Sequence, residues 1–295
     1  MPMGAWPSRP LSPGALPGTG GLLGCSARPL CVLLLCAGLQ CQLAVAGDDP
    51  AGWSSQSQPR VAIIIDDLGQ RLGYGLRAVQ LPGPVTCAFL PRAPYSKRLA
   101  ELAYRGHKEV ILHLPMEAVS QKPLDPGGLT INMPRSDLVA ALRADIEAIP
   151  HVRGINNHMG SLLTQHTESM EWVMAELMRR KDLYFVDSYT TARSVVSDVA
   201  TEYGIPHRTR DVFLDALPGA ESIERAFRHL LTIARRDGTA LAIAHPYPRS
   251  LAFLQSRIPG LVESGIDLVP VSDLIDRPGA HPIVASGHHD LHSAN

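Results

Sequence analysis

The chain has 295 residues, of which 45% are hydrophobic and 19% are charged, and its formal net charge is −1. This length is enough for one large domain or two small ones, and the composition argues against a chain that is disordered over most of its length. Because Lys and Arg are not in excess over Asp and Glu, nothing in the composition points to nucleic acid as a partner.

Residues 1–46 have the features of a secretory signal peptide. They contain two arginines and no acidic residue, and an apolar run that begins at Leu30 ends on Ala44-Val45-Ala46. This pattern predicts an exported protein that is cleaved after Ala46. The apolar run also approaches the length of a membrane-spanning helix, so an uncleaved leader that anchors the protein to a membrane stays open as an alternative.

Four of the five cysteines lie within this leader, namely Cys25, Cys31, Cys36 and Cys41. They fit its apolar run, because a free cysteine behaves as a small hydrophobic residue. Cleavage would leave Cys87 alone, so the mature chain could form no internal disulfide. Residues 47–59 are predicted to be a polar linker, and residues 277–295 a polar, disordered tail with four histidines. A domain over residues 60–276 remains between them.

Short apolar runs alternate with amphipathic segments along this domain. Strands are predicted at 61–65, 85–90, 110–114, 183–186, 240–244 and 268–271, with a weaker one at 152–155. Helices are predicted at 96–104, 136–148, 167–180 and 222–236, with start signals at Ser136 and Thr167. Regular alternation of this kind predicts parallel β-α units and an α/β fold, as either an open sheet or a barrel. No glycine-rich nucleotide-binding motif follows the first strand.

Polar residues that can bind a metal or take part in catalysis follow five of these strands, at the ends where α/β proteins place their functional groups. These residues are Asp66, Asp67, His113, Glu117, Asn156, Asn157, His158, Ser161, Asp187 and His245. Adjacent aspartates on an extended strand are expected to point to opposite sides, one toward a metal and one toward substrate. Asp67, His113 and His158 form a suitable ligand set for Zn²⁺ or another divalent ion. With a further carboxylate and imidazole as base and acid, the set indicates metal-assisted hydrolysis of an amide or ester.

Five segments in this order resemble the divergent polysaccharide deacetylase family. They are VAIIIDDLG (61–69), GHKEVILHLPMEA (106–118), GINNHMGS (154–161), FVDSYTTARS (185–194) and IAHPYP (243–248). The resemblance covers about residues 60–275 and implies a single-domain, distorted (β/α) barrel of the polysaccharide deacetylase type, with the site at its rim. It also implies an acetylated cell-envelope glycan, such as peptidoglycan, as substrate. Together with the exported leader, this predicts the bacterial periplasm as location.

The resemblance further implies roles for individual residues. Asp66 is similar to the family's catalytic base and Asp67 to its metal ligand, whereas Asp187 and His245 are similar to the pair that tunes and supplies the general acid. His113 matches the first position of the metal-binding H-x-x-x-H motif, but the second position is Glu117, so His158 becomes the candidate for the third ligand. The run Arg92-Ala93-Pro94-Tyr95 matches a deacetylase motif in its letters but precedes the histidine motif, and is interpreted as a coincidence.

The favoured hypothesis is therefore a metal-dependent hydrolase that removes acetyl groups, with zinc as the expected metal. The alternative is a non-catalytic periplasmic protein that keeps the fold and binds a glycan or a protein. An ordinary serine hydrolase has no support, since the chain lacks a G-x-S-x-G motif. Residues expected to contact substrate are Asn156, Asn157, Ser161 and Glu117, with Tyr95, Tyr189 and Tyr247 as candidates for stacking on a sugar ring.

Overall fold

The computed structural model of this protein describes residues 58–120 and 122–275. The predicted leader, most of the predicted linker and the predicted tail lie outside these residues. Within the described part of the chain, no helix has both the length and the apolar character needed to cross a membrane.

Parallel strands form one sheet, in the spatial order β6-β5-β4-β3-β2-β1-β8-β7, with β9 paired to β1. The strands are β1 (Arg60–Leu68), β2 (Thr86–Phe89), β3 (Glu109–Met116), β4 (Val152–Met159), β5 (Tyr184–Asp187), β6 (His207–Thr209), β7 (Val212–Phe213), β8 (Thr239–Ala244) and β9 (Asp267–Leu268). The helices are α1 (Leu72–Val79), α2 (Ser96–Arg105), α3 (Arg135–Ala148), α4 (Thr167–Arg179), α5 (Val196–Glu202), α6 (Ala220–Asp237) and α7 (Pro248–Arg257). Three short 3₁₀ turns complete the fold: η1 (Leu163–Gln165), η2 (Ile258–Gly260) and η3 (Val271–Asp273).

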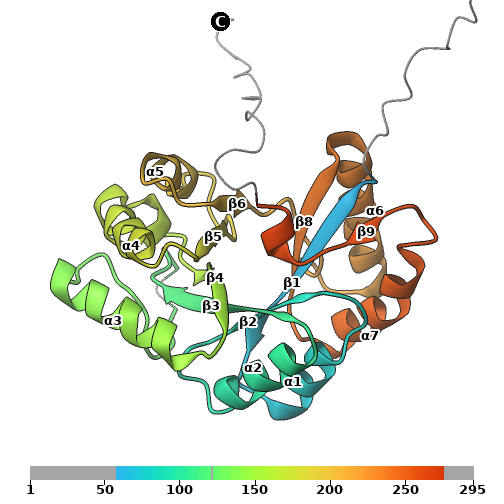
Figure 1. Cartoon of the computed structure of the whole chain (residues 1–295), viewed down its shortest axis with the longest axis horizontal. Coiled ribbons are helices and arrows are strands. Elements are labelled where there is room, and N and C mark those ends of the chain that lie inside the picture. The colour runs from blue at the N-terminus through green and yellow to red at the C-terminus, as the bar shows by residue number, and fades with distance from the viewer. Residues whose placement is uncertain (1–57, 121, 276–295) are drawn as a thin grey trace, which may run out of the picture. The chain divides into compact units, whose positions relative to one another are not determined.

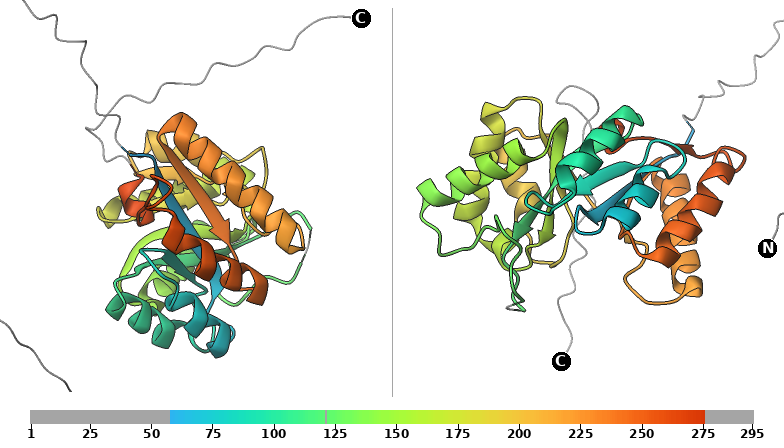
Figure 2. Two further views of the ribbon diagram at one scale, coloured as in Figure 1. Left: turned by 90° about the vertical axis from the view of Figure 1, so that its right-hand side faces the viewer. Right: turned by 90° about the horizontal axis from the view of Figure 1, so that it is seen from below.

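The sheet curls into a distorted barrel, and the chain passes directly from one edge strand of the sheet to the other. Strands β6 and β7 lie at opposite ends of the spatial order but are consecutive in sequence. Between them, the Arg210 amide donates to the Asp187 carbonyl at 3.0 Å, and the Asp211 amide donates to the Leu241 carbonyl at 2.9 Å. Two neighbouring residues thus join β5 to β8, and the helices lie outside the strands (Figures 1 and 2). The predicted distorted (β/α) barrel is confirmed.

Several predicted elements differ in detail from the structure. The strand predicted at 268–271 is reduced to β9 and is followed by η3, because Pro270 has no amide hydrogen to continue the ladder. Helix α4 begins at Thr167, but its N-cap is His166, whose Nδ1 accepts the Ser169 amide. The elements α1, α5, α7, β6 and β7 were not predicted, since the two strands are too short for a periodic pattern and Gly73 and Gly75 weaken the helical signal of α1.

Successive strand residues alternate between two apolar layers. In β1, Val61, Ile63 and Ile65 face the helices, whereas Ala62 and Ile64 face the barrel interior. The interior layer also contains Ala88, Ile111, Tyr184, Val186, Leu241 and Ile243, and η3 adds Val271. A Cβ atom at Gly154 would lie 2.3 Å from the Tyr184 ring, so only glycine leaves room for this tyrosine inside the barrel. Because strand side chains repeat every two residues, the next inward position on each strand lies one step closer to the rim.

Replacement of the core residue Phe185 tests the packing between sheet and helices. Phe185 on β5 has no exposed surface, and Phe185→Ala is expected to lower the free energy of unfolding by about 3–5 kcal/mol through lost burial and a residual cavity. Met178→Ala on the exposed side of α4 is the control and should change it by less than about 0.5 kcal/mol. Urea unfolding followed by circular dichroism measures both, and equal losses in the two variants would contradict the packing described here.

Candidate metal centre

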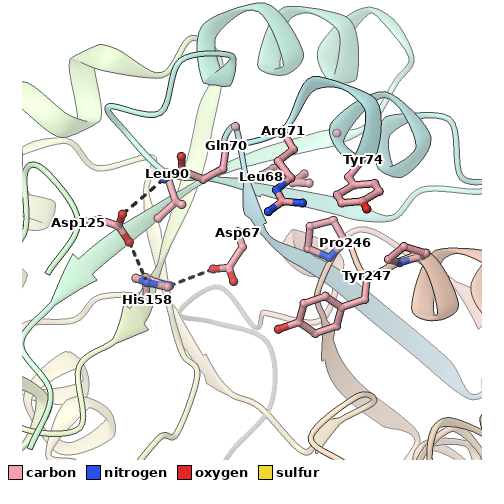
Figure 3. Close-up of a pocket in the computed structure, with 13 residues that line it drawn as sticks. Asp67, Leu68, Gln70, Arg71, Tyr74, Leu90, Asp125, His158, Pro246 and Tyr247 are labelled. Carbon is pink, nitrogen blue, oxygen red and sulfur yellow. Dashed lines mark hydrogen bonds and ion pairs between the residues drawn. The ribbon is translucent and has the colours of Figure 1, made fainter. Parts of the chain in front are cut away.

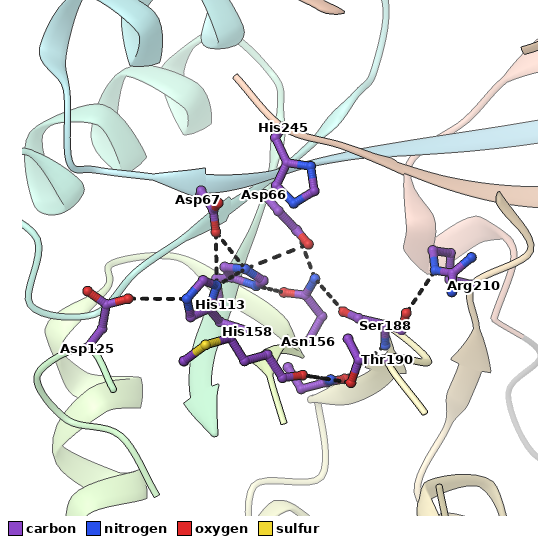
Figure 4. Close-up of polar contacts among 12 residues, drawn as sticks. Asp66, Asp67, His113, Asp125, Asn156, His158, Ser188, Thr190, Arg210 and His245 are labelled. Carbon is purple, nitrogen blue, oxygen red and sulfur yellow. Dashed lines mark hydrogen bonds and ion pairs between the residues drawn. The ribbon is translucent and has the colours of Figure 1, made fainter. Parts of the chain in front are cut away.

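A polar layer lies directly above the inner apolar layer of the barrel. On six strands, the residue two positions after an inward-facing residue is polar and belongs to this layer. The pairs are Ile64 and Asp66, Ile111 and His113, Gly154 and Asn156, Val186 and Ser188, Phe213 and Asp215, and Ile243 and His245. The two-residue period of the strands therefore brings side chains from distant parts of the sequence to one rim of the barrel (Figure 4).

An irregularity at the end of β1 adds a second carboxylate to this rim. Between the pairs Ile65–Cys87 and Leu68–Phe89, β1 has one residue more than β2, and Asp67 adopts a left-handed backbone conformation with φ of 57°. Such a bulge redirects a side chain that regular alternation would turn outward. The expectation that Asp66 and Asp67 point to opposite sides is wrong, because both carboxylates approach His113 Nε2, at 3.7 and 3.2 Å.

Three donor atoms converge at this point, and we call them the donor triangle: Asp67 Oδ1, His113 Nε2 and His158 Nδ1. Their separations are 3.2 Å from Asp67 to His113, 3.0 Å from Asp67 to His158, and 3.1 Å between the two imidazoles. A tetrahedral ion about 2.0 Å from each donor would require separations of about 3.3 Å. The triangle therefore has the size that a divalent metal ion needs.

Asn156 orients the first imidazole. This fully buried side chain donates through Nδ2 to Asp66 Oδ1 at 2.8 Å and accepts through Oδ1 from His113 Nδ1 at 2.8 Å. Because the carboxamide nitrogen is committed to Asp66, its oxygen faces His113, which must carry a proton on Nδ1. The Nε2 lone pair of His113 then points into the donor triangle, as in metal sites whose histidines are held by a second partner.

Asp125 contacts the second imidazole, since its Oδ2 lies 3.2 Å from His158 Nε2. A proton on Nε2 leaves the Nδ1 lone pair of His158 facing the triangle (Figures 3 and 4). Two nitrogen lone pairs and a carboxylate oxygen within about 3 Å repel one another unless a cation or a proton lies between them. This donor set fits a divalent metal with histidine and carboxylate ligands.

The pKa directions agree with a site that favours positive charge. Burial disfavours a charged His113, yet the carboxylates of Asp66 and Asp67 raise its pKa above the ordinary value. Burial alone would raise the pKa of Asp67, but hydrogen bonds and positive charge from His113 and His158, when these imidazoles are protonated, hold that pKa well below the usual range. Burial raises the pKa of Asp66, although the charges of His113 and His245 act in the opposite direction. The carboxylates thus stabilise a positive charge at the triangle, whether it is a proton or a metal ion.

His245 lies on the other side of Asp66 and is held by Asp215. Asp215 Oδ1 lies 2.8 Å from His245 Nδ1, and its Oδ2 accepts from the His245 amide at 2.8 Å and from Ser250 Oγ at 2.7 Å. Burial disfavours protonation of His245, but the hydrogen bond and charge of Asp215 and the charge of Asp66 outweigh it and raise the pKa of His245 to about 9. The imidazolium therefore keeps a proton on Nε2 at neutral pH.

Asp187 does not contact His245 in the structure. It is one residue out of phase with the inward positions of β5, between Val186 and Ser188, and its Oδ1 accepts the Tyr189 amide at 2.8 Å. Burial raises the pKa of Asp187 above the ordinary value, although its hydrogen bonds and the charge of the nearby Arg210 act in the opposite direction. Arg210 in turn donates to the carbonyls of Ser188 and Tyr189. Asp187 thus stabilises the end of β5, and Asp215 is the carboxylate that pairs with His245.

The other residues expected to bind substrate have partners within the chain. Asn157 accepts the Ser188 amide and donates to the Met159 carbonyl, both at 2.8 Å. Ser161 Oγ accepts the Val119 amide at 3.1 Å, and Glu117 Oε2 accepts the Ile131 amide at 2.9 Å. Together with Asn156, these side chains form the frame of the site.

A cleft of about 440 Å³ opens from the donor triangle. Asp67, His158 and Asp125 lie on one wall, whereas the opposite wall contains Tyr247 and Tyr74 (Figure 3). Of the three tyrosines predicted to stack on a sugar, only Tyr247 lines this cleft.

Asp125, Asp215 and Tyr74 are not among the site residues that the sequence predicted. Asp215 ends a V-F-L-D run whose strand, β7, has only two residues, so the run itself was the available signal. Asp125 lies in a loop, where no periodicity applies.

Comparison with known proteins agrees with these observations. Residues 63–275 match the divergent polysaccharide deacetylase family. The uncharacterized protein YibQ of Escherichia coli K12 is 33% identical over 219 residues, which cover 74% of this chain and 68% of YibQ. An uncharacterized protein of Haemophilus influenzae Rd is 32% identical over 220 residues, covering 75% and 78% of the two chains.

Among solved structures, the crystal structure of the uncharacterized protein ATU2773 from Agrobacterium tumefaciens C58 is similar, with a TM-score of 0.71 and 28% identity. The match covers 76% of this chain and 92% of that protein. The extent of the family match, the two sequence relatives and the shared fold lead to one conclusion. This chain belongs to the divergent polysaccharide deacetylase family.

Proposed function

We propose that this protein is a metal-dependent hydrolase that removes acetyl groups from a cell-envelope glycan after export to the periplasm. The observation that carries the proposal is the donor triangle with a buried carboxylate, Asp66, on one side and a protonated imidazole, His245, beyond it. A binding protein would need no such acid–base pair. The family supports acetylated carbohydrate as the class of substrate, and the leader pattern supports export.

Different residues of the site have different roles in the proposed reaction. Asp67, His113 and His158 would hold a divalent ion such as zinc, which supplies polarisation of the acetyl carbonyl and a more acidic water. Asp66, whose pKa is raised by burial, accepts the proton of the attacking water. Asn156 keeps the Asp66 carboxylate in position through its 2.8 Å hydrogen bond. His245, oriented by Asp215, donates its Nε2 proton to the departing amine or alcohol.

The cleft also supports a sugar substrate. Its tyrosine wall offers apolar faces of the kind that stack on sugar rings, and Tyr247 is about half exposed. The carboxylates and imidazoles lie on the opposite wall, so a sugar against Tyr247 would present its acetyl group to the donor triangle. A volume of about 440 Å³ is within the range of small-ligand sites.

Turnover is the direct test. The purified protein, loaded with zinc, is expected to release acetate from a panel of acetylated glycan fragments that includes peptidoglycan fragments. Asp66→Asn should lower the rate by about 10²–10⁴-fold, because it removes the base, and should still bind zinc. Zinc binding by the native protein without acetate release from any fragment would contradict the proposal and favour the glycan-binding alternative. Loss of zinc from the variant would mean that Asp66 is itself a ligand.

Metal content tests the ligands separately from turnover. His158→Ala removes one of the three converging donors and is expected to weaken zinc binding by more than about 100-fold in calorimetric titration. His229→Ala, at an exposed position on α6, is the matched control and should leave the affinity unchanged. Native affinity in His158→Ala would remove this residue from the ligand set.

The pH profile tests the acid. Since His245 must be protonated to donate, kcat/KM is expected to fall as pH rises through the raised pKa of about 9. Asp215→Asn removes the negative charge that raises this pKa, so the alkaline fall should move to lower pH, toward the ordinary histidine value of about 6.5. Asp237→Asn, in an exposed pair with Arg236, should leave the profile in place. An unchanged profile in Asp215→Asn would exclude His245 as the acid.

A further inference from the structure

The loop of residues 122–128, between β3 and α3, carries Asp125 to the mouth of the cleft. One carboxylate oxygen of Asp125 lies 3.2 Å from His158 Nε2, and the other accepts from Gln70 Nε2 at 3.4 Å. No strand places Asp125 in the polar layer of the barrel. Its position therefore depends on what holds the loop.

An ion pair between the buried Asp145 and the half-exposed Arg92 supports this loop. Asp145 on α3 has no exposed surface, and its Oδ1 accepts from Arg92 Nε at 3.1 Å. Its other oxygen, Oδ2, has no hydrogen-bond partner among the described residues. The backbone of Gly127 packs directly on this carboxylate with φ of 93°, and a Cβ atom there would lie 2.5 Å from Oδ1 and 2.7 Å from Oδ2. Only a glycine allows the loop to come this close.

We propose that Asp125 is a positioning residue for His158, and that the contact of Gly127 with the Arg92–Asp145 pair holds the loop where Asp125 reaches the imidazole. The inference rests on the metal site of the proposed function, and it assigns roles to Asp125 and Gly127, which lie outside the donor triangle. It also gives a structural role to Arg92, whose sequence run resembles a deacetylase motif but lies out of order.

The physical reason is a competition for one proton. A neutral imidazole carries its proton on either nitrogen, and a hydrogen bond decides which. Asp125 accepts the proton of His158 Nε2, so the Nδ1 lone pair remains in the donor triangle. Without this acceptor, the proton would move to Nδ1, 3.0 Å from Asp67 Oδ1, and the resulting hydrogen bond would occupy the position of the metal.

Nuclear magnetic resonance of the ¹⁵N-labelled, metal-free protein at pH 8 reads this tautomer directly. In the native protein His158 should carry its proton on Nε2, and in Asp125→Ala on Nδ1. Zinc affinity should fall by about 10- to 100-fold in Asp125→Ala and by less in Asp125→Asn, which keeps an acceptor oxygen. Asp198→Ala, at an exposed position on α5, is the control. An Nε2 proton and native zinc affinity in Asp125→Ala would overturn the proposal.

A pair of glycine variants tests the support of the loop. Gly127 and Gly204 both have positive φ, so a side chain strains the backbone at either, but a Cβ at Gly204 meets nothing within 4 Å. Gly127→Ala should therefore change the His158 tautomer and zinc affinity as Asp125→Ala does, whereas Gly204→Ala should change neither. Thermal unfolding selects a temperature at which both variants are folded. If Gly127→Ala behaves like Gly204→Ala in both readouts, the contact of Gly127 with Asp145 does not hold the loop in place, and this half of the proposal is overturned.

The two proposals fail in different ways. The tautomer is read without metal or substrate, so a native protein that releases no acetate would contradict the proposed function and leave the Asp125 measurement intact. Conversely, native acetate release with an Nδ1 proton on His158 in the native protein would contradict the role of Asp125 alone.

Discussion

The two-residue period of strands in a curled, barrel-like sheet is the constraint on which this site depends. Every second side chain of a strand must enter the interior, and the inward positions of six strands lie at matching levels. The inward positions farther from the rim carry apolar side chains such as Ile64 and Ile243, which exclude water. The next positions, one step toward the rim, carry the polar groups. A buried apolar layer beneath the site is also what raises the pKa of Asp66, since burial disfavours its charged form.

Contacts of the imidazoles with neighbouring side chains then decide what those polar groups can do. Asn156 links Asp66 to His113, and Asp125 faces the outer nitrogen of His158, so both imidazoles direct a lone pair to the same point. The arrangement is electrostatically unfavourable without a cation. A site of this kind is prepared for a metal before the metal arrives, and its partners matter as much as its ligands.

Much of the fold and part of the site followed from local patterns. Long apolar runs such as 61–65 and 110–114 identified central strands, because strands buried on both faces consist of continuous apolar residues. The residues after them included Asp67, His113 and His158, which the structure brings together. Short strands gave no such signal, and β7 and its Asp215 were missed for that reason. Asp187 was assigned a role with His245 although it lies one residue out of phase with the interior.

The sequence by itself determined the class of fold, the family and the three metal-ligand candidates, because these depend on the order of residues along single strands and on motifs that are contiguous in the chain. Only the tertiary structure decided which carboxylate pairs with His245, how Asp66 and Asp67 come to the same rim, and that Asp125 reaches His158. Those contacts join residues 30 to 50 positions apart, or depend on one bulged residue with φ of 57°. No local pattern records such contacts, since they arise only when the sheet curls and brings the strand ends together.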